Sequence, residues 1–245
     1  VARLRRAGAV VLGKANVPQA LYLHETTNPV WGRTVHPQFP DRGPGGSSGG
    51  DAALVAAGCV ALGIGNDLAG SIRQPAHACG IVGFVPRAES LGGGGAFETM
   101  PELVGERSRC GLLSRTVADA TAAWRALAPA GIPLGNASPP AGANRPLRVG
   151  WWADAGPLAA SDAVRRGVEI AVDRLRAAGV IVDRLDPDIA LEAAWIHLAI
   201  LSADGGADIR RLFAGERPIE PVRRLLSLAG VRGWGRRMLA GACVW

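Results

Sequence analysis

Two serine-bearing loops, both rich in glycine, constrain the fold of this chain more than any other feature. The first reads Gly45-Gly46-Ser47-Ser48-Gly49-Gly50. The second reads Gly65-Asn66-Asp67-Leu68-Ala69-Gly70-Ser71-Ile72-Arg73-Gln74-Pro75-Ala76. Glycine tolerates left-handed backbone and lets bare N–H groups approach a ligand closely. Loops of this kind suit an anion, or the negatively charged oxygen that develops during acyl transfer.

The segment between the loops predicts a helix followed by a strand. Residues 51–58 are rich in helix formers and end in Gly58, so Ser47 and Ser48 are expected at a helix N-terminus. Residues 60–65 form an apolar run typical of a buried strand, which would carry the second loop to Ser71. Together the helix and the strand are expected to bring the hydroxyl groups of the two loops close to one another.

The paired loops, followed by Cys79-Gly80, closely resemble the amidase signature family of serine amide hydrolases. The resemblance extends upstream through residues 13–19 and 28–34, and downstream through residues 111–119 and 147–185. It implies an α/β fold in which a mixed β-sheet is covered by α-helices. It also implies hydrolysis of a carboxylic amide through a serine acyl-enzyme, without a metal or an organic cofactor.

By position, the resemblance implies a role for individual residues of the two loops. Ser71 would be the nucleophile, and Ser47, held by a cis peptide, would be the bridging serine and also contact substrate. The oxyanion hole would consist of the backbone N–H groups of Leu68, Ala69, Gly70 and Ser71. Supporting roles would fall to Ser48 and to an ion pair of Asp67 with Arg73, and Leu21 would line the substrate channel.

Three positions depart from the family pattern. Asn66 replaces a common serine, and Ala69 replaces a glycine, which would carry strain of about 1–2 kcal/mol if its φ were positive. The family's catalytic lysine would fall before Val1, and Lys14, the only lysine, occupies a different position. The chain is therefore expected to be a fragment, lacking that lysine segment and the C-terminal part of the fold, and to be inactive as it stands.

Other functions fit parts of the pattern. Serines at a helix start are commonly caps, and Gly45-Gly46-Ser47-Ser48-Gly49 also matches the nucleophile elbow of α/β-hydrolases, although Arg42-Gly43-Pro44 is not a strand. A phosphate-binding module would need a Gly-Lys-Ser/Thr or a GxGxxG motif, and neither is present. Within the family, the alternatives are the A subunit of a glutamine-dependent tRNA amidotransferase and a non-catalytic binding protein. The NVPQ and NPVWGRT passages favour a general amidase.

The remaining segments predict alternating strands and helices in a single domain over residues 1–245. Strands are expected at residues 9–13, 81–86, 147–151 and 180–185. Helices are expected at residues 116–128, at residues 161–178 with Ser161 as the N-cap, and beyond Pro187. Residues 88–110 predict a surface loop, and residues 129–146, rich in Pro, Gly and Ala, a low-complexity linker across the surface.

The net charge of +6 raises the question of a nucleic-acid partner, but the charge is local. Residues 206–245 hold eight arginines against three acidic residues, a net +5, which leaves +1 for the rest of the chain. Solvated arginines on amphipathic helices explain this tail better than nucleic-acid binding.

The four cysteines form no CxxC pair, which is typical of reduced thiols in the cytoplasm. The sequence contains no apolar run long enough to predict a membrane span. The expected partner is a small-molecule amide, and a homodimer is allowed.

Overall fold

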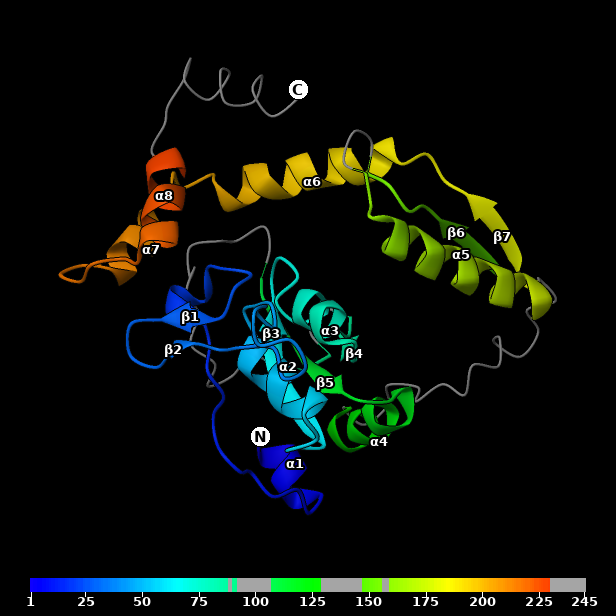
Figure 1. The fold of residues 1–245 in the computed structure, drawn as a ribbon, viewed down its shortest axis with the longest axis horizontal. Coiled ribbons are helices and arrows are strands. Elements are labelled where there is room, and N and C mark those ends of the chain that lie inside the picture. Colours follow the sequence, from blue (N-terminus) through cyan, green and yellow to red (C-terminus); the bar gives the residue numbers. More distant parts are fainter. Residues whose placement is uncertain (88–89, 92–106, 129–146, 156–158, 230–245) are drawn as a thin grey trace. The chain divides into compact units, whose positions relative to one another are not determined.

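The computed structural model describes residues 1–87, 90–91, 107–128, 147–155 and 159–229 (Figure 1). The chain divides into two compact units. Residues 1–134 and 204–230 form unit 1, and residues 135–203 and 231–245 form unit 2. Both serine loops belong to unit 1.

Unit 1 is built on a three-stranded antiparallel sheet with the strand order β3-β5-β4. The strands are β3 (Leu62–Asp67), β4 (Val82–Phe84) and β5 (Arg109–Ser114). β5 is central, because Leu113 lies opposite both Gly63 and Gly83. Successive side chains of a strand face opposite sides of the sheet. Leu112 and Leu113, both fully buried, therefore belong to two separate hydrophobic clusters.

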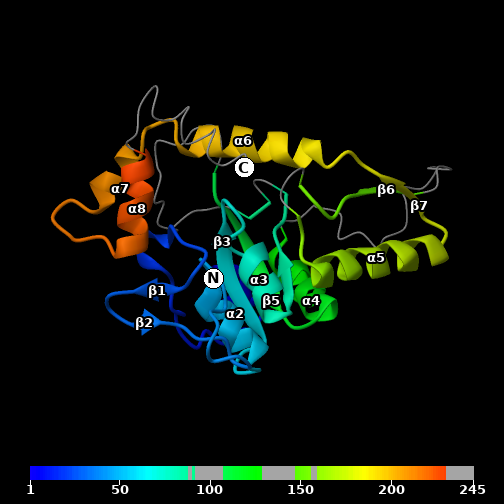
Figure 2. The ribbon, with the colours of Figure 1, turned by 45° about the horizontal axis from the view of Figure 1, so that its top comes forward.

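Helices cover both faces of this sheet (Figure 2). The helices of unit 1 are α1 (Ala2–Arg6), α2 (Gly49–Ala56), α3 (Arg73–Cys79), α4 (Val117–Leu127), α7 (Ala207–Leu212) and α8 (Glu220–Ala229). α2 and α3 contribute Val55 and Ala76 to the cluster of Leu113, whereas α1 and α4 contribute Leu4 and Leu127 to the cluster of Leu112. The serine loops lead into α2 and α3, so the packing of these two helices positions them. A short β1 (Thr27–Asn28) and β2 (Gly32–Arg33) hairpin precedes α2.

Unit 2 contains a β-α-β arrangement. β6 (Arg148–Trp151) and β7 (Ile181–Arg184) are parallel, α5 (Asp162–Ala177) connects them, and α6 (Asp188–Leu201) follows. Ser161 accepts a hydrogen bond from the Val164 N–H at 3.4 Å, which confirms it as the predicted N-cap of α5. Parallel and antiparallel strands, both combined with helices, confirm the predicted α/β class.

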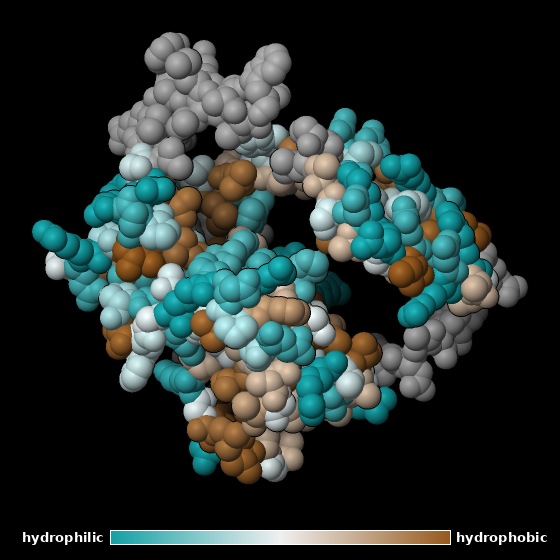
Figure 3. Space-filling model, viewed as in Figure 1, coloured by the Kyte–Doolittle hydropathy of each residue, from teal (hydrophilic) through white to brown (hydrophobic). Residues whose placement is uncertain are grey.

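Residues 9–13 do not form the predicted buried strand. Val10 is 82% exposed and Leu12 is 72% exposed, and no strand of the described residues pairs with this segment. An apolar run becomes a buried strand only where a neighbouring strand satisfies its N–H and C=O groups, and an apolar pattern does not say whether that neighbour is present. Figure 3 shows a brown hydrophobic area at its lower edge, where Figure 1 draws the blue N-terminal segment.

The predicted surface loop over residues 88–110 is wrong at its C-terminal end, because β5 already begins at Arg109. The sequence of residues 109–114 does not predict a strand, since glycine and serine positions interrupt any apolar alternation there. Most of that loop, and the predicted linker at residues 129–146, lie outside the described residues. The other predicted strands and helices are present, with boundaries shifted by at most two residues.

The basic C-terminal region behaves as predicted where it is described. Arg210, Arg211, Arg223 and Arg224 are all exposed. On α8, Glu220 forms ion pairs with Arg223 and Arg224, and on α7 Asp208 pairs with Arg211 at 2.7 Å. Among the residues described, no helix is both long enough and apolar enough to cross a bilayer.

Candidate active site

Hydrogen bonds from residues distant in the sequence hold the backbone of the first serine loop. The Cys79 thiol donates to the Pro44 carbonyl at 3.5 Å, and the Thr26 hydroxyl donates to the Gly45 carbonyl at 2.7 Å. The Gly46 N–H then donates to Gln74 Oε1 at 2.9 Å, and the Gly50 N–H donates to the Asn16 carbonyl at 3.2 Å. The loop is therefore fixed from four separate places in unit 1.

Glycine is required at this loop because other backbone lies against it. A Cβ on Gly46 would fall 2.6 Å from the Leu23 carbonyl oxygen and 3.0 Å from the Glu25 nitrogen. The peptide between Gly46 and Ser47 is cis, as the family resemblance implies. Ser47 and Ser48 are both buried, at 2% and 3% exposure, so the loop presents its hydroxyls to the interior of unit 1.

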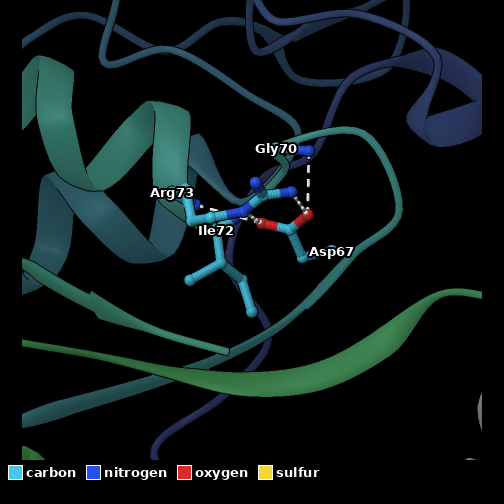
Figure 4. Close-up of polar contacts among 4 residues, drawn as sticks. All are labelled: Asp67, Gly70, Ile72 and Arg73. Carbon is cyan, nitrogen blue, oxygen red and sulfur yellow. Dashed lines mark hydrogen bonds and ion pairs between the residues drawn. The ribbon is translucent and has the colours of Figure 1, made fainter. Parts of the chain in front are cut away.

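The second serine loop is organised by the buried carboxylate of Asp67, at the end of β3 (Figure 4). Its Oδ1 accepts from the Gly70 N–H at 2.8 Å, and its Oδ2 accepts from the Ile72 N–H at 3.0 Å and the Arg73 N–H at 3.2 Å. The Arg73 guanidinium adds two further hydrogen bonds, at 2.7 and 3.1 Å, which form the predicted ion pair. Asp67 thereby caps the start of α3 and closes the loop around Ser71.

The ionisation of Asp67 follows from these partners. Burial acts to raise the pKa of this carboxyl, but the hydrogen bonds from Arg73 and from the N–H groups of Ile72 and Gly70 outweigh it. The pKa of Asp67 is therefore lowered, and the carboxylate is charged at neutral pH. A charged acceptor strengthens the hydrogen bonds that shape the loop.

One hydrogen bond joins the two serine loops directly: the Ser48 N–H donates to the Ser71 carbonyl at 3.0 Å. Ser71 is itself buried, at 8% exposure. Ser48 Oγ also lies against Gly65 of β3, where a Cβ would fall 2.2 Å from it. The prediction that the helix and the strand bring the two loops together is confirmed.

Helix capping does not explain these serines. Ser48 occupies the N-cap position of α2, but its side chain makes no capping hydrogen bond. The N-cap position of α3 is occupied by Ile72, not by Ser71. The N–H groups of Ile72 and Arg73 at the start of this helix donate to the Asp67 carboxylate. The burial of these serines therefore has another origin than helix capping.

The predicted oxyanion-hole segment has one N–H group that is already engaged, since Gly70 donates to Asp67. Gly70 has a φ of 107°, whereas Ala69 is not among the residues with positive φ. Alanine in place of glycine at position 69 therefore causes no left-handed strain. Leu68 is half-buried and Ala69 is exposed.

The predicted channel residue, Leu21, lies in a turn that reaches both loops. Ala20 and Leu21 have φ values of 56° and 59°. Three residues further on, the His24 ring lies beside Gly70, with Nε2 3.8 Å from the place where a Cβ of Gly70 would be. The turn therefore comes within reach of both the Gly46 and the Gly70 backbone.

Sequence reasoning missed the residues that hold the first loop. Thr26, Gln74 and Asn16 had no assigned role, although Gln74 and Asn16 lie in segments that carry the resemblance. Cys79 belongs to the recognised Cys-Gly pair, and burial raises the pKa of its thiol to about 11, so it is a neutral donor. A hydrogen bond to a distant backbone group leaves no periodic pattern from which to predict it.

A histidine ring, that of His24, lies beside the second serine loop at Gly70. Lys14 is exposed, and His77 is an exposed residue of α3. Within the described ranges, no three His, Cys, Asp or Glu side chains gather into a group that could bind a metal ion. Cys59, Cys79 and Cys110 are free thiols.

Comparison with known proteins gives one consistent family. The profile of the Amidase family matches residues 1–233. Fatty-acid amide hydrolase 1 of Sus scrofa is 32% identical over 97% of this chain and 42% of that protein. The A subunit of the glutamyl-tRNA(Gln) amidotransferase of Deinococcus radiodurans is 33% identical over 98% of this chain and 52% of that protein.

The fold gives the same answer. The solved structure of 6-aminohexanoate cyclic dimer hydrolase complexed with substrate superposes with a TM-score of 0.75 and 27% identity. The match covers 98% of this chain and 54% of that one, so the chain spans about half the length of the relatives it matches. With its family profile, its relatives and its paired serine loops in agreement, the chain belongs to the amidase signature family.

Proposed function

We propose that this chain carries the nucleophile half of an amidase that hydrolyses a carboxylic acid amide through a serine acyl-enzyme. The observation that supports the proposal most is the hydrogen bond from the Ser48 N–H to the Ser71 carbonyl, at 3.0 Å, which joins two loops of buried serines. An amide is a poor electrophile, so a serine needs an activating base and stabilisation of the developing oxyanion.

In the proposed reaction, Ser71 Oγ attacks the amide carbonyl carbon and gives its proton to Ser47, which passes its own proton to the base of the relay. Backbone N–H groups of Leu68, Ala69, Gly70 and Ser71 stabilise the oxyanion, with that of Gly70 shared with Asp67. The C–N bond then breaks as the proton passes through Ser47 to the leaving nitrogen, and water hydrolyses the ester on Ser71. Ser48, Asp67 and Arg73 hold the loops, and Leu21 with Ser47 contacts substrate.

The base of this relay is proposed to be a lysine contributed from outside residues 1–245. The only lysine of the sequence, Lys14, is exposed and occupies a different position from the catalytic lysine of the family. The 245-residue chain by itself is then expected to be inactive, and activity is expected from a longer polypeptide that contains it.

The test is labelling by an alkyl fluorophosphonate, which reacts with an activated serine. The complete reading frame around this sequence is expressed as the parent protein, as Ser71→Ala and as Ser47→Ala. We expect no labelling of Ser71→Ala and a loss on the order of 10²–10⁴-fold for Ser47→Ala, the usual contribution of general acid–base catalysis. Ser161→Ala, which removes only the N-cap of α5, is the matched control and should be labelled like the parent.

Two results would overturn the proposal. Labelling that persists in Ser71→Ala would place the nucleophile elsewhere. No labelling of the folded parent, with its upstream lysine present, would favour a non-catalytic binding protein on the same fold.

A second candidate function is release of ammonia from glutamine, as in the A subunit of a tRNA-dependent amidotransferase. Its support is the 33% identity to the Deinococcus radiodurans protein over 98% of this chain. Glutamine hydrolysis that exceeds hydrolysis of simple amides by the unlabelled parent protein would favour this candidate. The cytoplasmic location and the homodimer remain predictions, the second to be tested by light scattering.

A further inference from the structure

The turn of residues 19–24 is attached at its start to a segment that is 200 residues away in the sequence. Gln19 Oε1 accepts a hydrogen bond from the Ile219 N–H at 2.8 Å, and Gln19 Nε2 donates to the Arg217 carbonyl at 3.5 Å. Both ends of the Gln19 amide are therefore used on the backbone that leads into α8. The two segments belong to the same unit of the chain.

The backbone of this turn needs such an attachment. Ala20 and Leu21 are the only described residues other than glycine with positive φ, at 56° and 59°. Side chains with a Cβ rarely adopt this conformation, and it persists where the surroundings determine it strongly. Within the turn, the Leu21 N–H donates to Pro18 at 3.0 Å and the Tyr22 N–H donates to Gln19 at 3.3 Å.

Tyr22 provides a second link to the same C-terminal segment. Burial, followed by the nearby negative charge of Asp204, raises the pKa of the Tyr22 hydroxyl. Asp204 precedes α7 and accepts hydrogen bonds from the N–H groups of Gly206, at 2.7 Å, and Asp208, at 2.8 Å. The hydrogen bonds of Gln19 attach the turn to residues 217–219, and the charge of Asp204, on the other side of α7, acts on the Tyr22 hydroxyl.

The far end of the turn lies against the serine loops. The Leu23 carbonyl and the Glu25 nitrogen abut Gly46, next to the bridging Ser47, and the His24 ring abuts Gly70, next to Ser71. A shift of the turn would therefore move the backbone and the His24 ring that lie beside both proposed catalytic serines. Gln19 lies at the opposite end of the turn, so it acts on these groups only through the backbone of residues 20–23.

We propose that Gln19 is a positioning residue: by fixing the turn of residues 19–24 to the backbone of residues 217–219, it sets the acyl-group length that the serine site accepts. The proposal rests on the proposed function, in which Leu21 and the residues after it border the substrate. Loss of Gln19 would loosen the turn without removing either serine, so the reactivity of Ser71 toward small groups is retained and discrimination by length changes.

Rates of labelling by methyl and dodecyl fluorophosphonates test this in the complete polypeptide. The ratio of the two rates reports acyl length selectivity, whereas the methyl rate reports the nucleophile. Gln19→Ala removes both hydrogen bonds, and Ile219→Pro removes the N–H donor from the other side. Gln19→Glu keeps an acceptor for Ile219 and should restore most of the parent ratio. Gln38→Ala, an exposed glutamine of unit 1, is the matched control.

We expect Gln19→Ala and Ile219→Pro to change the ratio about 5-fold or more, a difference of roughly 1 kcal/mol in selectivity, with the methyl rate within about 2-fold of the parent. In both variants, the KM for a long-chain anilide should change, whereas the kcat for a short-chain anilide should stay close to that of the parent. An unchanged ratio in both folded variants would overturn the proposal, since it would make Gln19 purely structural.

Hydrogen exchange of the peptide spanning residues 19–26 measures the attachment without any catalysis. Faster exchange is expected in Gln19→Ala and Ile219→Pro, and not in Gln38→Ala. If the parent is never labelled at Ser71, the proposed function fails, and the proposed effect of Gln19 on acyl-length selectivity fails with it. This holds whatever the hydrogen exchange of residues 19–26 shows. If the parent is labelled but exchange and ratio are unchanged, only the role of Gln19 fails.

Discussion

The serine loops of unit 1 and the β6-α5-β7-α6 region of unit 2 differ in what they bury. Around the loops, Ser47, Ser48, Asp67 and Ser71 are all less than 9% exposed, and their backbone neighbours are hydrogen bonded. In unit 2, α6 contains no buried residue, and its Ile189, Trp195, Ile196 and Leu198 are 45–58% exposed. Polar groups lie inside one region and large apolar groups lie at the surface of the other.

This difference indicates that the two regions are stabilised in different ways. Burying a polar group is unfavourable unless it is hydrogen bonded, so the serine loops are fixed by many specific contacts, each of which matters. In the described part of unit 2, β6 and β7 are hydrogen bonded to each other, Val172 of α5 is buried, and the ion pair of Arg148 with Asp183 is exposed. Substitutions should therefore have large effects in the first region and small effects in the second.

The largest effect is expected for Asp67→Ala. It removes a carboxylate that accepts five hydrogen bonds and leaves the N–H groups of Gly70 and Ile72 without this acceptor. We expect the free energy of unfolding of unit 1 to fall by about 3 kcal/mol or more. Urea titration followed by hydrogen exchange of the peptide covering residues 62–80 measures it.

Asp183→Ala is the matched control in unit 2, where the pair with Arg148 is exposed, and it should cost at most about 1 kcal/mol. Because the pKa of Asp67 is lowered in the folded chain, its stabilisation is complete above the unfolded pKa of about 3.9 and is lost as the pH falls through the folded value. The difference between the parent and Asp67→Ala should therefore shrink in acid. Equal losses for Asp67→Ala and Asp183→Ala would break the comparison.

Two glycines give a second contrast, of opposite sign. Gly46→Ala would place a Cβ 2.6 Å from the Leu23 carbonyl, and a backbone atom cannot move aside cheaply. We expect unit 1 to lose about 1–3 kcal/mol. Gly167 lies within α5 with nothing within 4 Å of its Cβ position, so Gly167→Ala should stabilise unit 2 by about 0.5–1 kcal/mol. Thermal unfolding measures both, and a stabilised Gly46→Ala would contradict the close packing of that loop.

Asp51, in the first turn of α2, should give a pH-dependent effect. Burial raises the pKa of its carboxyl to about 6, although hydrogen bonds from its own N–H and from the Ile64 N–H lower it. The folded chain therefore holds this proton more tightly than the unfolded chain, and stability falls as the pH rises from about 4 to about 6.

Asp51→Asn keeps an acceptor without the charge. It should be more stable than the parent by about 1–2 kcal/mol above pH 6 and equal to it below pH 4, as followed by urea unfolding. Asp173→Asn on the exposed surface of α5 is the control and should show no such window. A parent that is equally stable at pH 4 and pH 7, with no gain in the variant, would rule out a buried charge at Asp51.

The smallest effect is expected for Ile196→Ser on α6. Ile196 is 57% exposed, so little apolar surface is uncovered, and the free energy of unfolding should change by no more than about 0.5 kcal/mol. Ile170→Ser on α5, at 53% exposure, should behave alike. A loss of 1 kcal/mol or more at Ile196 alone, measured by hydrogen exchange of α6, would indicate that this side chain is packed.

The meeting of the two serine loops was predictable from the sequence, whereas the residues that hold the loops were not. Paired serines with flanking glycines predict loops that meet, because glycine has no Cβ and lets other backbone approach the loop closely. Asn16, Thr26 and Gln74 were not predictable, since each acts on a backbone group distant in the sequence. The exposed segment at residues 9–13 and the central β5 show the same limit, because an apolar or glycine-rich run does not state which strand lies beside it.

By itself, the sequence determined the family, the α/β class, the helix ends to within two residues and the residues of the serine loops, all of which depend on local chemistry and spacing. Only the tertiary structure decided which groups hold those loops, that Asp67 rather than a serine caps α3, and that Gln19 connects the turn of residues 19–24 to residues 217–219. The physical reason is range. Backbone preference and capping act over a few residues, whereas burial and hydrogen bonding between distant segments exist only after the chain has folded.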